Sequence, residues 1–307
     1  MPVLVAAPVF VCVNPHAGGR VDADVEQRIR ALFHDRHRDV ELLAFDPHGG
    51  ALRQKISPGS TIVAAGGDGT VSAVAALALE TSSTLGVLPL GTLNHFAKDL
   101  GIPTDLEKAV DLVASAHTRT VDVGFVNDRL FVNNCSLGVY PTVVAAREQL
   151  RRLGHRKWSA MLIAIARVLP RHHRLIVKLD ADGEPAVWRT PFVLIANNAY
   201  ETAGLGFGGR KSIQAGRLFA YVAPAIRARQ LPVAAAKAIV AGALARQRHA
   251  EGRFEEVDAS QMWIDATGPR RVTVAIDGEL STISLPAHFR SAPRALRVIA
   301  PAESEPR

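Results

Sequence analysis

Short apolar runs alternate with helical patterns over the first 120 residues. The apolar runs predict four buried strands, at residues 8–13, 40–45, 61–65 and 85–88. Between them, apolar residues recur at intervals of three or four, which indicates amphipathic helices around 25–33, 51–56, 71–80 and 106–113. Strands that alternate with helices are typical of a parallel α/β sheet. The N-terminal part is therefore predicted to be an α/β domain.

The pattern changes at residue 120, where closely spaced short strands replace the helices. They are predicted at 120–123, 130–134, 175–179, 192–196, 218–222, 261–264, 272–276 and 281–285. Such spacing favours an antiparallel β-sandwich. A last apolar run at 296–300 is expected to return to the first domain. The prediction is thus an α/β domain at 1–123, joined by residues 290–307, and an all-β domain at 124–289.

Two basic, amphipathic stretches interrupt the predicted sandwich, at 143–174 and 225–249. Each surrounds an apolar stripe with lysine and arginine, and the first contains Trp158. Such a stretch is typical of a helix at a membrane surface, or of a helix packed on the sandwich with a solvated basic face. The apolar run 158–170 is too short to cross a bilayer, so any membrane contact is expected to be peripheral.

Charge is divided unevenly along the 307 residues. The net charge of +7 combines −4 over residues 1–123 (10 basic and 14 acidic residues) with +11 over the remainder. A basic second domain suits an anionic lipid surface or nucleic acid. We see no nucleic-acid motif and no aromatics interleaved with the basic residues, so no nucleic-acid partner is expected.

The two cysteines and the N-terminal residues indicate in which cellular compartment the protein is expected. Cys12 and Cys135 lie in apolar strands, with neither a disulfide framework nor metal-ligand spacing. Residues 1–13 lack a basic start and a cleavage site, so they are interpreted as a buried strand rather than a signal peptide. These features predict a protein of the reducing cytoplasm.

Three glycine-rich loops, at 14–19, 66–70 and 91–95, each follow a predicted strand and precede a predicted helix. In an open α/β sheet they converge on the carboxyl edge, where ligands bind. Glycines and a helix N-terminus favour phosphate, and the Asp68 carboxylate suits magnesium, directly or through water. The alternative is a tight turn with a capping aspartate. No loop has the Gly-Lys-Ser/Thr of the Walker pattern.

A second acidic pair, Asp277 and Glu279, follows the predicted strand 272–276. Two residues apart on a regular strand, they would share a face, and a carboxylate in a cleft can serve as a general base. The same residues also form an Asp-Gly turn typical of a plain hairpin. The two interpretations are compatible, since a hairpin tip can present a base.

In combination, these motifs resemble the diacylglycerol kinase catalytic-domain superfamily, specifically the bacterial lipid kinases related to sphingosine kinases. The matching stretches are Asn14-Pro15-x-Ala17-Gly18, Gly66-Gly67-Asp68-Gly69-Thr70, Leu88-Pro89-Leu90-Gly91-Thr92-x-Asn94-x-Phe96-Ala97, Phe131-x-Asn133-x-x-Ser136-x-Gly138 and Asp277-Gly278-Glu279. The second stretch is shared with NAD kinases and phosphofructokinases. The combination in this order is specific.

The resemblance implies an N-terminal nucleotide domain, a C-terminal lipid-substrate domain and catalysis in the cleft between them. It implies ATP and Mg²⁺ as cofactors and transfer of the γ-phosphoryl group to a lipid hydroxyl. By their match to the family motifs, the implied catalytic residues are Glu279 as proton acceptor, Asp277 beside it, and Asp68, which would anchor magnesium-linked water. Asp122 is a further acidic residue that could belong to the metal network. The implied ATP-binding residues are Asn14, Pro15, His16, Ala17, Gly18, Gly66, Gly67, Asp68, Gly69, Thr70, Gly91, Thr92 and Asn94.

Three positions depart from the family pattern. His95 stands where an aspartate is usual, and Ala215 replaces the aspartate of a secondary structural metal site, which is therefore expected to be absent. The end of the second strand, at Ala44 and Phe45, carries no hydroxyl where a nucleotide-binding threonine is often found. At Asp68 and Glu279 the sequence keeps the acidic residues of the family pattern.

The expected protein is an ATP-dependent lipid kinase at the inner face of the cytoplasmic membrane. Its acceptor is diacylglycerol-like, sphingoid or another lipid alcohol, and the family's tendency to dimerise suggests a possible homodimer. Two alternatives remain. One is a kinase of nucleotides like NAD kinase, although no Asn-Glu/Asp pair for the dinucleotide ribose is found mid-chain. The other is a non-catalytic nucleotide-binding membrane adaptor, suggested by His95 and Ala215.

Overall fold

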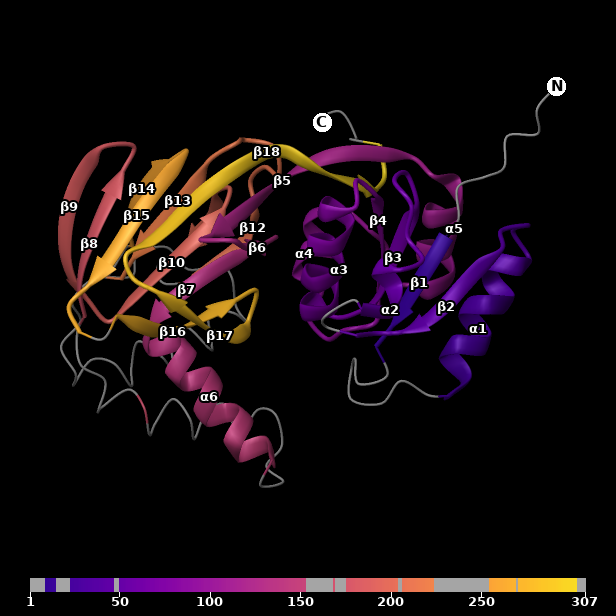
Figure 1. The fold of residues 1–307 in the computed structure, drawn as a ribbon, viewed down its shortest axis with the longest axis horizontal. Coiled ribbons are helices and arrows are strands. Elements are labelled where there is room, and N and C mark those ends of the chain that lie inside the picture. Colours follow the sequence, from indigo (N-terminus) through magenta and orange to yellow (C-terminus); the bar gives the residue numbers. More distant parts are fainter. Residues whose placement is uncertain are drawn as a thin grey trace. The chain divides into compact units, whose positions relative to one another are not determined.

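The chain divides into two compact units in a computed structural model (Figure 1). Unit 1 comprises Met1–Val123 and Pro293–Arg307, and unit 2 comprises Gly124–Ala292. The structure describes residues 9–14, 23–46, 50–152, 168, 175–203, 206–223, 254–268 and 270–302. The predicted basic stretch 225–249 and most of 143–174 lie outside these residues.

Unit 1 is built on a sheet in which neighbouring strands are parallel, in the order β2-β1-β3-β4-β18. Its strands are β1 (Val9–Val13), β2 (Val40–Ala44), β3 (Thr61–Gly66), β4 (Thr84–Pro89) and the final part of β18 (Ala287–Ile299). Every residue of β1 and β4 is buried. Uninterrupted apolar runs form these strands because helices cover both faces of a parallel sheet.

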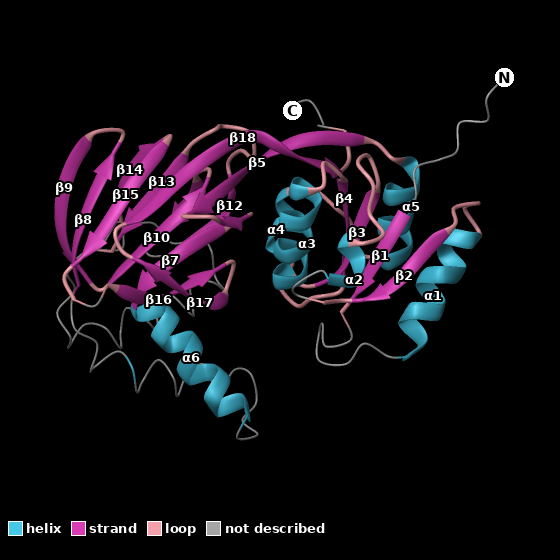
Figure 2. Cartoon of the chain, viewed as in Figure 1, coloured by secondary structure: helices cyan, strands magenta, loops and turns pink. Residues whose placement is uncertain are grey.

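In the described part of unit 1, five helices connect and cover these strands (Figure 2). They are α1 (Ala23–His34), α2 (Gly50–Arg53), α3 (Asp68–Glu80), α4 (His95–Asp99) and α5 (Leu106–Ser115). Phe33 of α1 and Val110 of α5 pack with Val11 in one cluster of the core. Phe10 and Cys12, which alternate with that residue along β1, are buried as well. Both faces of the sheet are therefore covered.

Unit 2 consists mainly of two antiparallel sheets. One sheet contains the first part of β18 with β15 (Gln261–Ala266), β8 (Leu175–Ala181) and β9 (Glu184–Thr190). In addition, β5 (Thr118–Val126), which starts in unit 1, pairs with β18 and with β6 (Arg129–Phe131). The other has the order β14-β13-β10-β7-β16-β17. Its strands are β7 (Asn134–Gly138), β10 (Phe192–Asn197), β13 (Leu218–Val222), β14 (Glu255–Ala259), β16 (Arg271–Ile276) and β17 (Glu279–Ser284). A separate hairpin joins β11 (Tyr200–Ala203) and β12 (Gly206–Arg210), and α6 (Val139–Arg152) follows β7.

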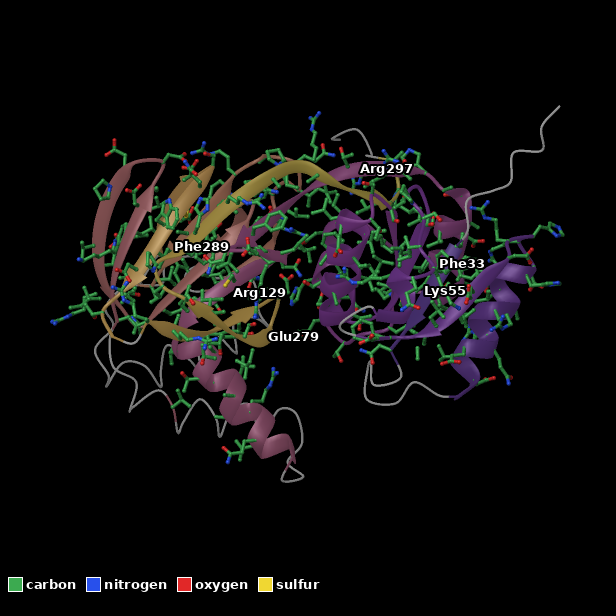
Figure 3. The ribbon with its side chains drawn as sticks, viewed as in Figure 1. Phe33, Lys55, Arg129, Glu279, Phe289 and Arg297 are labelled. Carbon is green, nitrogen blue, oxygen red and sulfur yellow. The ribbon has the colours of Figure 1, made fainter. Side chains whose placement is uncertain are left out.

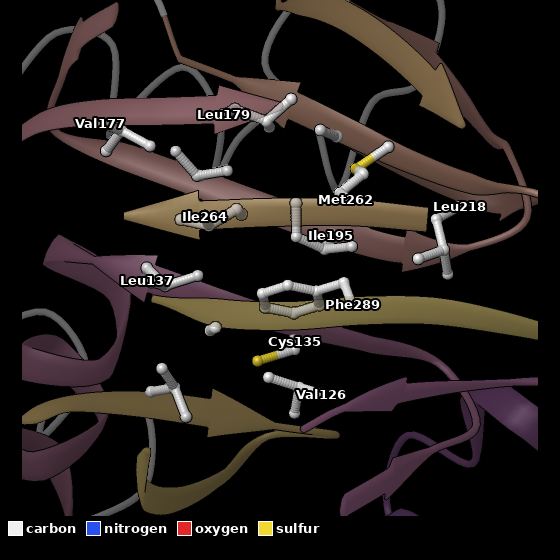
Figure 4. Packing of buried hydrophobic residues seen from close by; sticks show 14 of the residues in the cluster. Val126, Cys135, Leu137, Val177, Leu179, Ile195, Leu218, Met262, Ile264 and Phe289 are labelled. Carbon is white, nitrogen blue, oxygen red and sulfur yellow. The ribbon is translucent and has the colours of Figure 1, made fainter. Parts of the chain in front are cut away.

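The core of unit 2 lies between side chains contributed by both sheets (Figure 4). Met262, Ile264 and Phe289 come from one sheet, and Cys135 and Ile195 come from the other. All five are fully or nearly fully buried. This face-to-face packing explains why apolar residues alternate along these strands.

The chain passes between the two units twice, through β5 and β18, which pair with each other. Close to this passage, within unit 1, Asp122 Oδ1 accepts a hydrogen bond from the backbone N–H of Arg294 at 2.7 Å. Arg294 has a φ of 51°, which is unusual for a residue with a side chain. The buried Asp122 carboxylate thus stabilises an irregular residue of β18.

The predicted fold class is confirmed: a mostly parallel α/β unit precedes an antiparallel β unit. Several local predictions were wrong. The expected strand 130–134 is two strands, β6 and β7, because the chain turns at Val132 and Asn133. The strands β9, β11, β12 and β14 were not predicted.

Candidate functional site

Asn14, at the start of the first glycine-rich loop of unit 1, is hydrogen-bonded to both ends of the second loop. Asn14 follows β1, and its Nδ2 donates a hydrogen bond to Thr70 Oγ1 at 2.8 Å. The Asn14 backbone N–H donates to the carbonyl of Ala65 at 3.0 Å. Pro15, His16, Ala17 and Gly18 lie outside the described residues, so their predicted contacts with ATP remain predictions.

The second loop leads directly into helix α3. Gly67 occupies the N-cap position with extended backbone angles (φ −93°, ψ −173°), and no side chain caps the helix. The first N–H groups of an α-helix have no partner within the helix and attract anions. Gly66 is required because a Cβ there would lie 2.4 Å from Thr70 Oγ1. The loop therefore has the local geometry of a phosphate-binding turn.

The third loop packs directly on the second. A Cβ added to Gly91 would lie 2.5 Å from the Cα of Gly67 and 2.6 Å from Asn94 Oδ1. The Leu90 backbone N–H donates to the Gly66 carbonyl, at 3.0 Å. Asn94 has a φ of 50° and donates from Nδ2 to the Gly91 carbonyl at 2.9 Å, which closes the loop on itself. The glycine at 91 thus lets the third loop meet the second backbone to backbone at Gly67.

Asp68, the first residue of α3, contacts the start of α4. Its Oδ1 accepts a hydrogen bond from the Phe96 backbone N–H at 3.2 Å. His95, which replaces the usual acid, directly precedes Phe96 and is exposed, as is the predicted ATP ligand Thr92. No group of three or more acidic, histidine or cysteine side chains that could hold a metal is found in the described part of the chain. Mg²⁺ on a nucleotide needs only one or two carboxylates, so Asp68 alone fits such an ion.

In unit 2, the carboxylate of Asp277 accepts three hydrogen bonds from backbone N–H groups. Oδ2 bonds to Val132 at 2.8 Å, and Oδ1 bonds to Asn133 at 2.8 Å and Asn134 at 3.0 Å. In return the Asp277 N–H donates to the Asn134 carbonyl, at 2.8 Å. Asp277 is 9% exposed. These contacts fix the turn between β6 and β7, so they indicate a positioning role for this residue.

Glu279 begins β17, directly after a two-residue turn. Asp277 and Gly278 have φ values of 47° and 85°, and Ile276 pairs with Glu279, which defines a type I′ hairpin. The premise that Asp277 and Glu279 share a face of a regular strand is wrong, because a turn lies between them. Partial desolvation, and secondly the Asp277 charge, raise the pKa of Glu279 above its usual value. An exposed carboxylate with a raised pKa suits a general base.

The sequence Asp-Gly-Glu occurs a second time, at residues 182–184, and it forms the same turn. Asp182 and Gly183 have φ values of 50° and 93° between β8 and β9. Asp182 also accepts from a neighbouring turn, from the N–H groups of Ser260 and Gln261, each at 3.0 Å. These bonds lower the pKa of Asp182. The tripeptide by itself therefore describes a hairpin, and Glu184 is a natural internal control for Glu279.

Asp122, the further acidic candidate for the metal network, is 1% exposed on β5. Its Oδ1 is engaged by the Arg294 N–H described above. This contact gives Asp122 a structural role, and metal binding by Asp122 remains a prediction. Ala215, the other position discussed for a metal, is exposed.

Comparison with known protein families finds a match for the residues that form these loops. The family model for the diacylglycerol kinase catalytic domain matches residues 8–126, which span β1 to β5 and all three loops. Residues 8–126 belong to the diacylglycerol kinase catalytic-domain family. The predicted family is thereby confirmed for these residues.

Individual relatives extend the similarity beyond the catalytic-domain match. A Yersinia pestis protein named "Probable lipid kinase YegS-like" is 28% identical over 231 residues, which are 72% of each chain. An uncharacterized Synechocystis protein is 29% identical over 248 residues. That match covers 80% of this chain and 56% of the Synechocystis protein, so this chain spans little more than half the length of that relative.

Solved structures show the same fold over nearly the whole length of this chain. A structure of a diacylglycerol kinase from Bacillus anthracis aligns with 96% of this chain and 97% of that chain, with a TM-score of 0.65 and 19% identity. A second Bacillus anthracis structure aligns over the same shares with a TM-score of 0.69 and 24% identity. At these identities the likeness establishes the fold.

Proposed function

We propose that the protein transfers the γ-phosphoryl group of ATP to the hydroxyl of a membrane lipid. The observation that carries the proposal is the backbone contact between the loops at Gly67 and Gly91, with Asp68 beside it, at the carboxyl edge of a parallel sheet. This edge is the usual position of nucleotide phosphates in α/β folds. Membership of the catalytic-domain family supports the same activity.

In this proposal, unit 1 binds ATP. The N–H groups at the start of α3 and the glycines of the loops at 66–70 and 91–94 bind the phosphates, and Asn14 holds Thr70 in place. Mg²⁺, held by Asp68 through water, would neutralise charge on the phosphates. Phosphoryl transfer requires positioning and charge neutralisation above all, which such loops supply.

Unit 2 provides the base. Glu279 accepts the proton of the lipid hydroxyl while that oxygen forms a bond to the γ-phosphorus and the bond to the ADP oxygen breaks. Asp277 does not transfer the proton in this scheme, because its carboxylate is occupied by the backbone N–H groups of residues 132–134. It instead holds the hairpin from which Glu279 extends.

The lipid acceptor suggests where the protein works. The net charge of +11 over residues 124–307 favours an anionic membrane surface, and we propose peripheral association with the inner face of the cytoplasmic membrane. Among the described residues no helix has the length and apolar character needed to cross a bilayer. The suggested homodimer remains a prediction that a measurement of the mass in solution would test.

Purified protein, labelled ATP and a total lipid extract test the proposal. We expect a labelled lipid product from the wild-type protein, and none from Asp68→Asn or Glu279→Gln. Glu184→Gln, which changes the equivalent position of the other Asp-Gly-Glu turn, should be fully active. Phosphorylation of NAD with all lipids inert, or ATP binding without any turnover, would overturn the proposal.

A further inference from the structure

One peptide group in the turn between β6 and β7 lies between a cation and an anion. Its N–H belongs to Asn133 and donates to Asp277 Oδ1 at 2.8 Å. Its carbonyl belongs to Val132 and accepts a hydrogen bond from Arg210 Nη1 at 2.6 Å. A guanidinium on β12 and a carboxylate that follows β16 are therefore joined through a single peptide group.

Opposite charges at its two ends polarise this peptide group. The guanidinium favours negative charge on the carbonyl oxygen, and the partial double bond to nitrogen then makes the N–H more positive. A more positive N–H is a stronger donor to the Asp277 carboxylate, because hydrogen bonds of ionised groups are shorter and stronger than neutral ones. The two distances, 2.6 and 2.8 Å, are at the short end of the range for N–H donors.

Asn197 supplies neutral donors to the same side of the turn. Its Nδ2 donates to the Val132 carbonyl at 3.0 Å, and its backbone N–H donates to the Asn133 carbonyl at 2.9 Å. The Val132 carbonyl thus has two donors, so removal of the Arg210 guanidinium leaves it with a partner. What Arg210 adds to this turn is its charge, and a substitution there is not expected to unfold the protein.

The β11–β12 hairpin positions Arg210. Arg210 is the last residue of β12, is partly buried, and pairs with Tyr200 on β11. The Tyr200 hydroxyl accepts a hydrogen bond from Asn134 Nδ2 at 3.1 Å, and the Asn134 N–H is another of the donors to Asp277. The Tyr200 backbone N–H donates to the hydroxyl of the buried Tyr221 at 2.8 Å. The hairpin therefore contacts the turn at two points and is anchored to β13.

The proposed base follows the turn that this network holds. Asp277 is, after desolvation, the second cause of the raised pKa of Glu279. The further charged side chains that the structure describes on elements next to β17 are Arg129 of β6, Arg147 of α6 and Arg271 of β16. Figure 3 shows Arg129 and Glu279 at the same end of unit 2. Burial raises the pKa of the neighbouring Cys135 thiol, which therefore stays neutral.

We propose that Arg210 is a positioning residue for the reaction. Through the peptide group of residues 132 and 133 it holds the Asp277 carboxylate, and with it the hairpin from which Glu279 extends. Arg210 touches neither ATP nor the lipid in this arrangement. The inference rests on the proposed function and adds to the same site a residue from β12, which no sequence motif singled out.

A charge that acts through a peptide group has a kinetic signature of its own. Loss of the Arg210 charge displaces the base, so it lowers kcat and leaves the KM for ATP unchanged. The effect also requires the Asp277 carboxylate at the other end of the peptide group. The losses caused by Arg210→Gln and Asp277→Asn are therefore not additive, as expected for two residues in one hydrogen-bond network.

The experiment measures kcat and the KM for ATP with labelled ATP and vesicles of a bacterial total lipid extract, at a pH on the plateau of the activity profile. The proteins are the wild type, Arg210→Gln, Arg210→Lys, Asp277→Asn and the double variant Arg210→Gln/Asp277→Asn. Arg189→Gln is the control at an exposed arginine on β9. We expect Arg210→Gln to lower kcat by about tenfold, as when an ionic hydrogen bond becomes neutral, and Arg210→Lys to retain most of the activity. The double variant should lose no more than the weaker single variant.

A second measurement needs no substrate. The proton chemical shift of the Asn133 amide, in isotope-labelled protein, reports the strength of its hydrogen bond to Asp277. We expect this resonance to move upfield in Arg210→Gln, because the bond becomes weaker, and to stay in place in Arg189→Gln.

Three results would overturn the inference. An unchanged kcat and an unmoved Asn133 amide in Arg210→Gln would exclude any action through the peptide group. A raised KM for ATP with unchanged kcat would make Arg210 a nucleotide ligand. A loss of kcat that Arg210→Lys shares, with a lowered melting temperature, would reduce Arg210 to a structural link between β12 and the turn. A wild-type protein that phosphorylates no lipid would instead contradict the proposed function, while the Asn133 amide still tests the Arg210 contact.

Discussion

The Asp277 carboxylate accepts a hydrogen bond from the backbone N–H of Asn133 at 2.8 Å, across 144 residues of sequence. Together with the bonds to Val132 and Asn134, this contact attaches the β16–β17 hairpin to the turn between β6 and β7. Glu279 directly follows the hairpin turn. The position of the proposed base is therefore determined by a backbone contact between two turns.

Replacing Glu279 with glutamine should strongly lower kcat without destabilising the fold. Loss of a general base lowers kcat by roughly 10²–10⁴-fold. The pKa of Glu279 is raised in the folded protein, so folding disfavours its ionised form, and its contribution to stability is lost as pH rises through that pKa. At pH 7 the variant should melt at the same or a higher temperature than the wild type, and any difference should vanish in acid. A clearly lower melting temperature at pH 7 would contradict this.

Asp277→Asn should shift the pH dependence of activity. The Asp277 charge is the second cause of the raised pKa of Glu279, so its removal lowers that pKa. Glu279 must be ionised to accept a proton, and the acid limb of the kcat/KM profile should therefore move to lower pH. Desolvation, the larger cause, remains and limits the shift. If the variant is active and the acid limb of its kcat/KM profile is unchanged, that limb does not report the ionisation of Glu279.

Gly91→Ala should weaken nucleotide binding by about tenfold or more. The new methyl group would lie 2.5 Å from the Cα of Gly67, so one of the two loops must move. Titration with ATP followed by calorimetry measures the loss. Gly50→Ala is the matched control, because its methyl group would meet only Asp46 Oδ2, at 3.5 Å. Equal affinities of the two variants for ATP would exclude the loop contact from nucleotide binding.

Asp122→Ala should lower the free energy of unfolding by about 0.5–1.5 kcal/mol, since it removes the acceptor of the part-buried hydrogen bond from the Arg294 N–H. Urea denaturation measures the change, with the exposed Asp24→Ala as control. If Asp122 instead served mainly as a metal ligand, the stability would be unaffected and the Mg²⁺ dependence of ATP binding would change.

The sequence allowed the loops of unit 1 to be placed because their signals are local. Each loop follows a continuous apolar strand, and Gly66 and Gly91 stand where an added Cβ would clash with a neighbouring loop residue. The strand β14 was missed because its sequence, Glu-Glu-Val-Asp-Ala, has little apolar character, and β12 because it is rich in glycine.

The site residues of unit 2 depend on contacts that no local pattern contains. The break between β6 and β7 and the role of Asp277 both come from one long-range interaction. The hydrogen bond between Arg129 and Ser281, 152 residues apart, is another contact that no local pattern predicts. The hairpin turn at Asp277 and Gly278 was predicted from its Asp-Gly pair, and the second Asp-Gly-Glu, at 182–184, repeats the same local signal.

The parallel sheet of unit 1 takes the strand that pairs with β4 from the end of β18, after all of unit 2 has been synthesised. During translation, the edge of β4 that pairs with β18 therefore stays unpaired until residues near Val298 emerge from the ribosome. An open strand edge is a template for wrong pairing. The nascent chain is thus most exposed to aggregation through the domain made first, and a late frameshift would damage that same domain.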